Sequence, residues 1–526
     1  MRTNFTRSSS WLVGLFFGAL LLVGVLVYRD YGVSTDEVVH HLNGMVNVKY
    51  IGQRLAPELA RRQASYATIP DLKGYVDNDH GVIFEAPVAM LSLLLTHHDS
   101  RGYYFMRHLL VFLTFASGTW ALFQLGQLRF QSWRWGLLAP FMLVLSPRFF
   151  AEAFYNGMDI VFMAAFTMAM YTLVRLLHRP SFGRILLHSL ASAVAIDVRI
   201  VGLLTVGLTI GFLGLSLVQP RIATYRRPAY ARATLLYIAF TLLFVVIGWP
   251  YLWEDPVGNF AAALTRMSRF PWLGYNFYFG HYLRGYEVPW HYIPVWIVIT
   301  TPVPYTVAGI IGLFSCGLAF FRRKSNSFDL LLIGWLLAPL ALIITLHSAV
   351  YNGWRHLYFI YPALLLLAVH GIRALRDLGL RSPAWRTVVL LVGLVAALEV
   401  VHTAVRMVRM HPQQQVYFSF LPASVAEAWF DRDYWGLSYR AGLEWILAHD
   451  VAPQIVVSSP RADLVYNNSL LLPAAQRQRL RIVYPDQEPI NYLLTHYAAQ
   501  VPASSLGHTV HKVYAGDLLV LTIFRP

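Results

Sequence analysis

Charged residues are scarce in this sequence of 526 residues, because Asp, Glu, Lys and Arg make up only 13% of it. Soluble chains carry roughly 25% charged residues, so the composition excludes an ordinary soluble protein. Cysteine is almost absent too: Cys316 is the one cysteine, which excludes an intrachain disulfide. The chain is instead 57% hydrophobic, and this balance is typical of a membrane protein.

Acidic residues are scarcer than basic ones, 27 against 42, which gives a net charge of +15. An excess of positive charge can bind nucleic acid, so its position in the sequence decides whether it indicates such a partner. Positive charge in every second connection between apolar runs marks cytoplasmic loops. The sequence therefore gives no argument for a nucleic-acid partner and predicts a cytoplasmic N-terminus. The basic connections are 129–134, 175–184, 221–232, 322–324 and 373–386.

A small-residue cleavage motif is also missing after the first apolar run, Trp11–Val27, so we expect a retained anchor helix. A membrane span needs about 20 apolar residues. Basic connections fall on one side of the membrane throughout only if the apolar run 184–218 is divided into two spans near Asp197 and Arg199. Eleven spans are then predicted, near 11–28, 102–127, 134–150, 153–177, 184–199, 200–218, 232–252, 289–320, 328–349, 356–375 and 384–408.

Two segments outside the spans are long enough to build structure. The outer loop 29–101 contains a short apolar run, Phe84–Leu95, that reads as a helix at the membrane surface. Residues 411–526 show soluble patterning, with a helix near 441–449, strands near 454–458 and 479–484, and a hairpin over 510–524. We therefore predict a transmembrane module, 1–410, and a small α/β domain, 411–526, on the outer face.

The first outer loop opens with Ser34-Thr35-Asp36-Glu37-Val38-Val39-His40-His41. Ionisable groups beside hydrocarbon are costly, and such groups are often functional. On a helix, Asp36 and His40 are four residues apart, as are Glu37 and His41, so each pair shares a face. Carboxylate and imidazole also suit a divalent metal, which is an alternative interpretation of this cluster.

Several outer segments add acids, cations and aromatic rings. A transferase that uses a lipid-linked sugar phosphate needs a carboxylate base, cations for the phosphate, and rings that stack on sugars. Such side chains outside the first cluster include His80, Glu85, Arg148, Asp159, Arg199, Trp253, His281, Tyr351, Arg355 and His356.

The order of these motifs resembles the GT-C membrane glycosyltransferases, specifically the family 39 type that includes relatives of protein O-mannosyltransferases and of the lipid A aminoarabinose transferase. The resemblance covers about residues 10–410 and implies a polytopic α-helical fold. Its motifs are Thr35-Asp36-Glu37, Gly81-Val82-Ile83-Phe84-Glu85-Ala86-Pro87, Ser146-Pro147-Arg148-Phe149-Phe150-Ala151-Glu152, Asn156-Gly157-Met158-Asp159 and Arg355-His356-Leu357-Tyr358-Phe359-Ile360-Tyr361-Pro362.

The resemblance implies roles for individual residues. Asp36 becomes the acceptor base, with Glu37 and Asp159 as further acids in the catalytic site. The residues expected to hold the donor phosphate are Arg148, Arg199, His281, Arg355 and His356. The expected acceptor or sugar contacts are His40, His80, Glu85, Trp253 and Tyr351. No metal or other cofactor is expected. Around Phe84-Glu85-Ala86-Pro87 the chain lacks the basic residue and paired prolines that relatives often show.

Each role has a structural alternative. Asp36 and Asp159 could cap helices, and Glu37 could be a structural partner. Arg199 could extend its charged end to the membrane interface, and Arg355 and His356 could anchor a helix there.

Two functions remain open at this stage. The first is an inverting transferase that moves a sugar from a polyprenyl-phosphate monosaccharide to a glycan, lipid or protein hydroxyl, at the outer face of a bacterial inner membrane. The alternative is a transporter or flippase for a lipid-linked or polar solute. Transporters tend to show internal repeats and charges near the bilayer midplane. This chain shows no convincing repeat and gathers its ionisable residues on one side, which favours the transferase.

Overall fold

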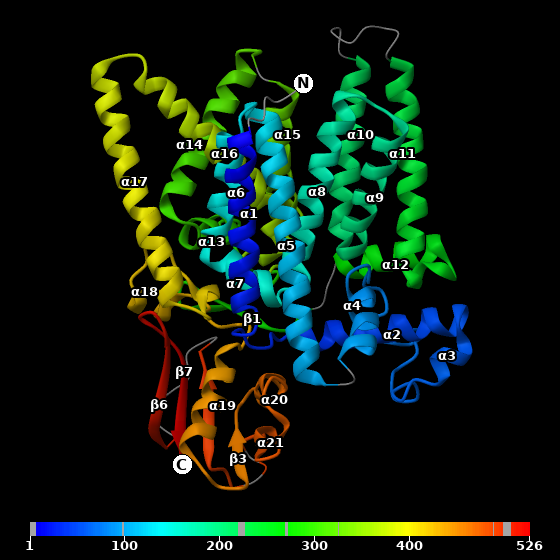
Figure 1. Cartoon of the computed structure of the whole chain (residues 1–526), viewed down its shortest axis with the longest axis vertical. Helices are drawn as coiled ribbons and strands as arrows, with labels where there is room; N and C mark the ends of the chain where they lie inside the picture. Colours follow the sequence, from blue (N-terminus) through cyan, green and yellow to red (C-terminus); the bar gives the residue numbers. More distant parts are fainter. Residues whose placement is uncertain are drawn as a thin grey trace.

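In the computed structural model a bundle of long apolar helices stands above a smaller region that contains a sheet (Figure 1). The N-terminal end of α1 and the sheet region lie at opposite ends of the bundle. The structure describes residues 7–96, 99–218, 227–268, 272–324, 326–485, 487, 489–497 and 507–526.

Of the described residues, nine helical segments are long and apolar enough to cross a membrane. The fold class predicted from the sequence is therefore confirmed. The segments include two short 3₁₀ turns, Ile200–Gly202 before α10 and Arg355–Ile360 (η4) before α16. The helices are α1 (Arg7–Val27), α5 (Ser100–Phe130), α8 (Asp159–His178), α10 (Leu203–Val218), α11 (Arg227–Gly248), α14 (Val303–Phe321), α15 (Ser327–Thr345), α16 (Tyr361–Gly379) and α17 (Pro383–Arg409).

Two further segments complete the bundle. Helices α6 (Trp133–Val144) and α7 (Pro147–Tyr155) meet at a bend of 71°, where Pro147 begins the second helix. Proline suits the first turn of a helix, where its missing N–H costs nothing. Helix α9 (Phe182–Val198) packs against α8 and α11. It ends directly before Arg199, whose backbone is extended, so the predicted division near Arg199 is confirmed.

Two predicted spans have different boundaries in the structure. The run 134–150 was expected to be one span, but it bends within Leu145–Pro147 and the second half continues to Tyr155. The run 289–320 is two helices, α13 (Tyr292–Thr300) and α14, because Thr301-Pro302 interrupts the backbone hydrogen bonding. Apolar composition alone does not reveal such breaks.

Close backbone contact holds part of the bundle together. A Cβ atom on Gly312 of α14 would lie 1.8 Å from the Leu367 carbonyl oxygen of α16, and one on Gly371 would lie 2.1 Å from that of Ala308. Small residues let helix backbones approach closely, which drives association where the solvent is as apolar as the side chains. Both positions therefore require glycine.

Short elements cover the end of the bundle that faces the sheet (Figure 1). The run Phe84–Leu95, expected to form a surface helix, is α4 there, which confirms that helix. The covering elements are α2 (Glu37–Leu55), α3 (Pro57–Arg61), α4 (Glu85–Leu95), the 3₁₀ turn Pro250–Trp253, α12 (Pro256–Ser268), α18 (Ala423–Trp429) and the hairpin of β1 (Tyr275–Tyr278) and β2 (His281–Arg284).

The tail forms a five-stranded sheet in the order β4-β3-β5-β7-β6. Strand β3 pairs in parallel with β4 and β5, whereas β7 pairs antiparallel with β5 and β6. The predicted helix, strands and hairpin are confirmed, and β5, α20 and α21 were missed. The elements are α19 (Ser438–His449), β3 (Ile455–Ser458), α20 (Ala462–Ser469), α21 (Ala474–Arg477), β4 (Leu480–Val483), β5 (Tyr492–His496), β6 (His508–Ala515) and β7 (Leu518–Arg525).

The apolar core is divided between the two regions. Residues 416–437 contribute buried side chains to the large core of the bundle, including Val416, Tyr434 and Trp435. The sheet has its own cluster around Leu443, Val457 and Leu494. The chain therefore contacts the bundle well beyond residue 410, while the boundary itself stays a prediction.

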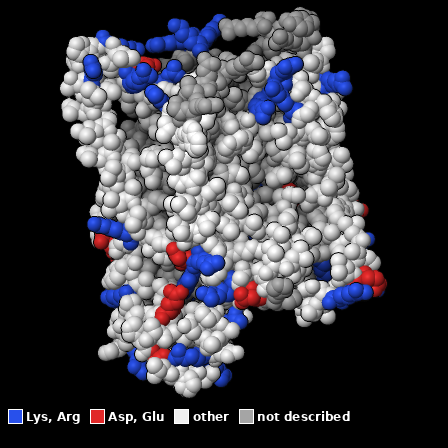
Figure 2. Space-filling model, viewed as in Figure 1, with Lys and Arg blue, Asp and Glu red and all other residues white. Residues whose placement is uncertain are grey.

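Charge is distributed unevenly along the long axis. On the face shown in Figure 2, Lys and Arg gather at the end away from the sheet with little acid nearby, whereas both signs mix at the sheet end. This is the asymmetry that the loop charges predicted. The orientation relative to the two sides of a membrane stays a prediction.

Candidate active site

Asp36 lies immediately before α2, where four residues from distant parts of the chain meet. Among the described residues its side chain makes no capping hydrogen bond to α2, so it is free to face elsewhere. The Arg355 guanidinium donates from Nη1 to Asp36 Oδ2 over 2.6 Å. The Arg355 side chain is 5% exposed and that of Asp36 is 31% exposed. The acid therefore remains open to a molecule from outside.

The same arginine connects Asp36 with a second acid. Arg355 Nη1 lies 3.6 Å from Asp159 Oδ2, and Arg199 Nη1 lies 3.0 Å from Asp159 Oδ1. Asp159 is the first residue of α8, and Arg199 follows α9 directly. Two carboxylates and two guanidiniums thus alternate in a chain, which we call the ion cluster (Asp36, Arg355, Asp159 and Arg199).

The turn before α8 holds Asp159 in place. Asn156 donates from Nδ2 to Asp159 Oδ2 over 3.0 Å and to Glu152 Oε2 over 2.7 Å, while its Oδ1 accepts from the Asp159 backbone over 2.8 Å. Glu152 in turn accepts from the Tyr358 hydroxyl over 2.8 Å and from Tyr434 over 3.4 Å. The network orients Asp159 through buried groups that the list of predicted site residues did not include.

Aromatic rings surround Arg355. Its guanidinium carbon lies 4.7 Å from the centre of the Trp435 ring and 5.1 Å from that of Tyr351. The His356 ring meets Tyr351 edge-on at 4.5 Å, and Trp272 stacks on Tyr351 at 4.3 Å. Predicted residues Tyr351 and His356 therefore lie beside the ion cluster, with both rings partly exposed.

Glu37 points away from the ion cluster into a second buried network. It is fully buried, accepts from the Ser34 backbone N–H over 2.7 Å, and lies 3.1 Å from His108 Nε2 and 3.6 Å from Arg107 Nε. Arg107 also binds both oxygens of Glu85. Sequence reasoning missed Arg107 and His108, although an arginine and a histidine inside an apolar run are a strong signal.

The histidines of the opening cluster separate from one another. His40 Nδ1 lies 3.7 Å from Glu85 Oε1 and 3.4 Å from Arg107 Nη2, whereas His41 packs on the Tyr103 ring at 4.0 Å. Burial lowers the pKa of both histidines, that of His41 to about 4. Among the described residues, these histidines and Asp36 are not found as a group of three or more potential metal ligands with donor atoms within 4.8 Å of one another.

The remaining predicted residues lie outside the ion cluster. His80 lies 3.2 Å from Asp79 Oδ1, and Trp253 donates to the Val246 carbonyl over 2.8 Å. Arg148 is buried and donates to the Tyr417 carbonyl over 2.9 Å. His281 begins β2 and is exposed on the hairpin. None of the four has a direct contact with the ion cluster among those found in the described part of the chain.

Charge decides the protonation of Asp36. Burial alone would raise the pKa of its carboxyl, but the Arg355 charge opposes it, with smaller effects from His40 and Arg199, and the pKa ends below the ordinary value. Glu85 behaves alike, since Arg107 outweighs burial. Asp36 is therefore ionised at neutral pH and can accept a proton.

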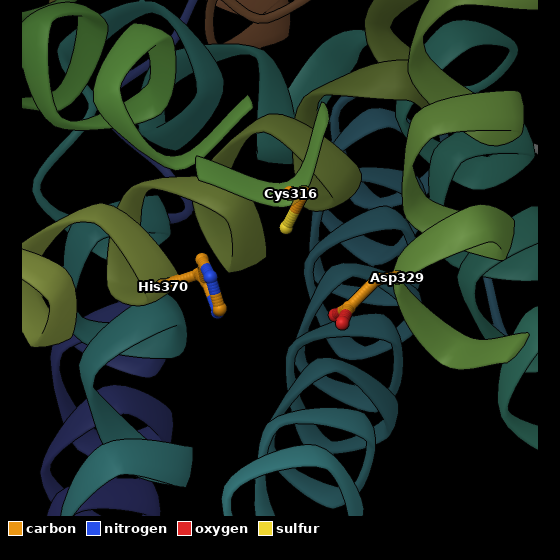
Figure 3. Close-up of side chains that lie close together, drawn as sticks. All are labelled: Cys316, Asp329 and His370. Atoms are coloured by element: carbon orange, nitrogen blue, oxygen red, sulfur yellow. The ribbon is translucent and has the colours of Figure 1, made fainter. Parts of the chain in front are cut away.

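A different group of potential metal ligands lies far from Asp36 in the chain. Within the described residues, Cys316, Asp329 and His370 have donor atoms within 4.8 Å of one another (Figure 3). Arg129 occupies both oxygens of Asp329, over 2.7 and 3.0 Å, and its Nη2 lies 3.4 Å from His370 Nδ1. A metal would have to displace this guanidinium. We therefore interpret Asp329 and His370 as partners of Arg129, and we call this arrangement the arginine clamp.

No protein-family model and no curated protein matches the sequence. The structure is similar to ArnT from Cupriavidus metallidurans in the apo state, with a TM-score of 0.50 and 13% identity over 98% of each chain. ArnT bound to undecaprenyl phosphate gives a TM-score of 0.50 and 15% identity over 98% of each chain. For the apo Archaeoglobus fulgidus oligosaccharyltransferase the TM-score is 0.49 and the identity 11%, over 93% of this chain and 70% of that one.

The likeness to ArnT extends over nearly the whole length of both chains, so it includes the tail as well as the bundle. At this identity it shows a shared fold. The chain therefore has the GT-C fold, as the motif resemblance predicted. What this particular chain does must be argued from its own residues.

Proposed function

We propose that this protein is an inverting membrane glycosyltransferase that moves a hexose or pentose from a polyprenyl-phosphate donor to an acceptor hydroxyl. The ion cluster carries the proposal, because Arg355 lies 2.6 Å from Asp36 while Arg199 lies 3.0 Å from Asp159. A base for the acceptor and cations for the leaving phosphate are the two groups that such a displacement needs.

On the donor side, Arg199 and Arg355 hold the phosphate, and His356 lies beside them. Guanidinium groups bind phosphate through two parallel hydrogen bonds, and they neutralise the charge that grows as the bond to the sugar breaks. The ArnT structure with undecaprenyl phosphate supports a lipid phosphate as the ligand of this fold. Arg148 and His281, with no contact to the cluster, are weaker candidates for this role.

On the acceptor side, Asp36 takes the proton of the hydroxyl whose oxygen attacks the anomeric carbon. The bond between that carbon and the phosphate oxygen breaks, and polyprenyl phosphate leaves with the electron pair. Paired with Arg355, Asp36 is a weak base because its pKa is low. Phosphate that binds Arg355 would weaken the pair and raise this pKa, so donor binding prepares the base.

The remaining assignments follow the same proposal. Asp159 orients the two arginines, and Glu37 supports the start of α2 from the second network. His40, His80, Glu85, Trp253 and Tyr351 stay candidates for sugar or acceptor contacts, with Tyr351 favoured by its place beside Arg355. No metal or cofactor is required, since the arginines supply the positive charge. The proposal locates the protein in a bacterial inner membrane, with residues 411–526 on the outer side.

Asp36→Asn tests the proposal. The amide keeps the shape and cannot accept the proton, so transfer from a polyprenyl-phosphate sugar should fall by about 10²- to 10⁴-fold. Asp30→Asn is a matched control from the same loop, because Asp30 pairs with His411 over 2.8 Å, away from the ion cluster. Full activity of a folded Asp36→Asn protein would overturn the proposal. Movement of the lipid-linked sugar across vesicles without transfer would favour a flippase.

A further inference from the structure

The segment that carries Asp36 is held by the tail of the chain. Residues 32–34 have no regular secondary structure and lead directly to Asp36. Asn468 of α20 binds both peptide groups at Val33: its Oδ1 accepts from the Val33 N–H over 3.1 Å, and its Nδ2 lies 3.2 Å from the Val33 carbonyl oxygen. The two residues are 435 positions apart in the sequence.

The same amide also ties the tail to itself. Asn468 Nδ2 lies 3.0 Å from the Gly436 carbonyl oxygen and 2.9 Å from that of Leu464, and the side chain is fully buried. A Cβ atom on Gly32 would lie 2.4 Å from Asn468 Oδ1, so the two segments of the chain touch without room for a side chain at position 32. The Asn468 side chain is therefore held by Gly436 and Leu464 of the tail, and it in turn binds the backbone of Val33.

A second contact from the tail acts on the same segment. The Thr35 N–H donates to the Trp435 carbonyl over 3.2 Å, and the Trp435 ring lies 4.7 Å from the Arg355 guanidinium carbon. Trp435 thus contacts Arg355 and also the residue directly before Asp36. Asn468 and Trp435 together make three hydrogen bonds to the backbone of Val33 and Thr35, directly before the acid.

We infer that Asn468 is a positioning residue for Asp36, so that the tail completes the catalytic site of the bundle. The inference rests on the proposed function, in which Asp36 is the base. Asn468 touches neither of the reacting groups and acts through the backbone of 33–35. A displacement of about 1 Å at a catalytic group can cost on the order of 10²-fold in rate.

Asn468→Ala is the first test, made in the full-length protein. We expect kcat for sugar transfer to fall by about 10- to 100-fold with the KM for the donor unchanged, because the hydrogen bonds of Asn468 go to Val33, Gly436 and Leu464 and not to the two arginines that hold the phosphate. Amide hydrogen exchange in 31–37 should become faster. Asn491→Ala is the matched control: Asn491 Oδ1 accepts from the Val456 N–H over 2.7 Å within the sheet and leaves Asp36 untouched. Wild-type kcat and exchange in Asn468→Ala would overturn the inference.

A second perturbation reaches the same contact from the opposite side. Gly32→Ala places a methyl group against Asn468 Oδ1 and should reproduce both effects, even if Asn468→Ala yields no folded protein. Residues that act as one unit are not additive. In an Asp36→Asn background, either change should therefore cause no further loss of residual activity. A further loss of 10-fold or more would show that Asn468 acts independently of Asp36.

These outcomes separate the inference from the proposed function. If Asp36→Asn is fully active, Asp36 is not the base and the proposed function fails. If Asp36→Asn is inactive while folded Asn468→Ala keeps wild-type kcat and exchange, the proposed function stands and the positioning role is wrong.

Discussion

Arg355 donates to Asp36 over 2.6 Å, although the two residues are 319 positions apart in the sequence. The pair joins the proposed acceptor base to the proposed phosphate ligand. Each can therefore change the chemistry of the other, and the effect of one on the pKa of the other can be measured.

The first prediction concerns pH. The Arg355 charge holds the pKa of Asp36 below the ordinary value against the effect of burial. In the wild type, the loss of kcat/KM that comes from Asp36 should therefore appear only as the pH falls below the usual carboxylate range. Arg355→Gln removes the charge, so the pKa rises and the acid limb moves to higher pH. Profiles of kcat/KM between pH 3 and 8 check this, and coincident acid limbs would contradict it.

The second prediction concerns stability. Arg107 lies between the buried carboxylates of Glu37 and Glu85. Arg107→Met would leave both without their cation, which costs about 3–5 kcal/mol in similar buried pairs. Thermal unfolding in detergent should show a clear decrease in Tm. Arg101→Met is the control on the same helix, because Arg101 is exposed and its loss should change stability by less than about 0.5 kcal/mol. Equal Tm values for both variants would refute the prediction.

Much of the architecture could be predicted from hydropathy and charge, because both are local properties. The break before Arg199 followed from the alternation of basic loops, and the tail hairpin followed from its turn residues. The bend at Pro147 and the break at Thr301-Pro302 were missed, because an apolar run looks the same whether it is straight or bent.

The candidate site was predicted in part. The structure brings Asp36, Asp159, Arg199 and Arg355 together, while the roles assigned to them stay predictions. Asn468 and Trp435 could not be found from the sequence. Asn468 makes its contact over 435 positions, which no local pattern encodes. Arg107 is different, because a charged residue inside a predicted apolar span can be recognised from the sequence, and it was not included among the candidate site residues.

The third prediction concerns metal binding by the group of Cys316, Asp329 and His370. Arg129 binds both Asp329 oxygens, so added Zn²⁺ should leave the Tm of the wild type unchanged. Arg129→Met frees the carboxylate among donor atoms within 4.8 Å of one another, a set that suits zinc. Zn²⁺ should then raise the Tm of this variant, and Cys316→Ser in the same background should abolish the increase. A zinc-dependent Tm in the wild type would contradict the clamp.

The last prediction separates ligand binding from catalysis. If Arg199 and Arg355 hold the donor phosphate, the product undecaprenyl phosphate should bind without any sugar present. A ligand at 100 times its Kd stabilises a protein by about 2.7 kcal/mol, which is a measurable rise in Tm. Arg199→Gln removes one of the two guanidiniums near Asp159. This variant should need at least 10 times more undecaprenyl phosphate than the wild type for the same rise in Tm. Arg175→Gln is the control, because Arg175 lies in the last turn of the helix that Asp159 begins. Equal weakening in both variants would show that the lipid phosphate binds through general charge, and unchanged binding in Arg199→Gln would remove Arg199 from the donor site.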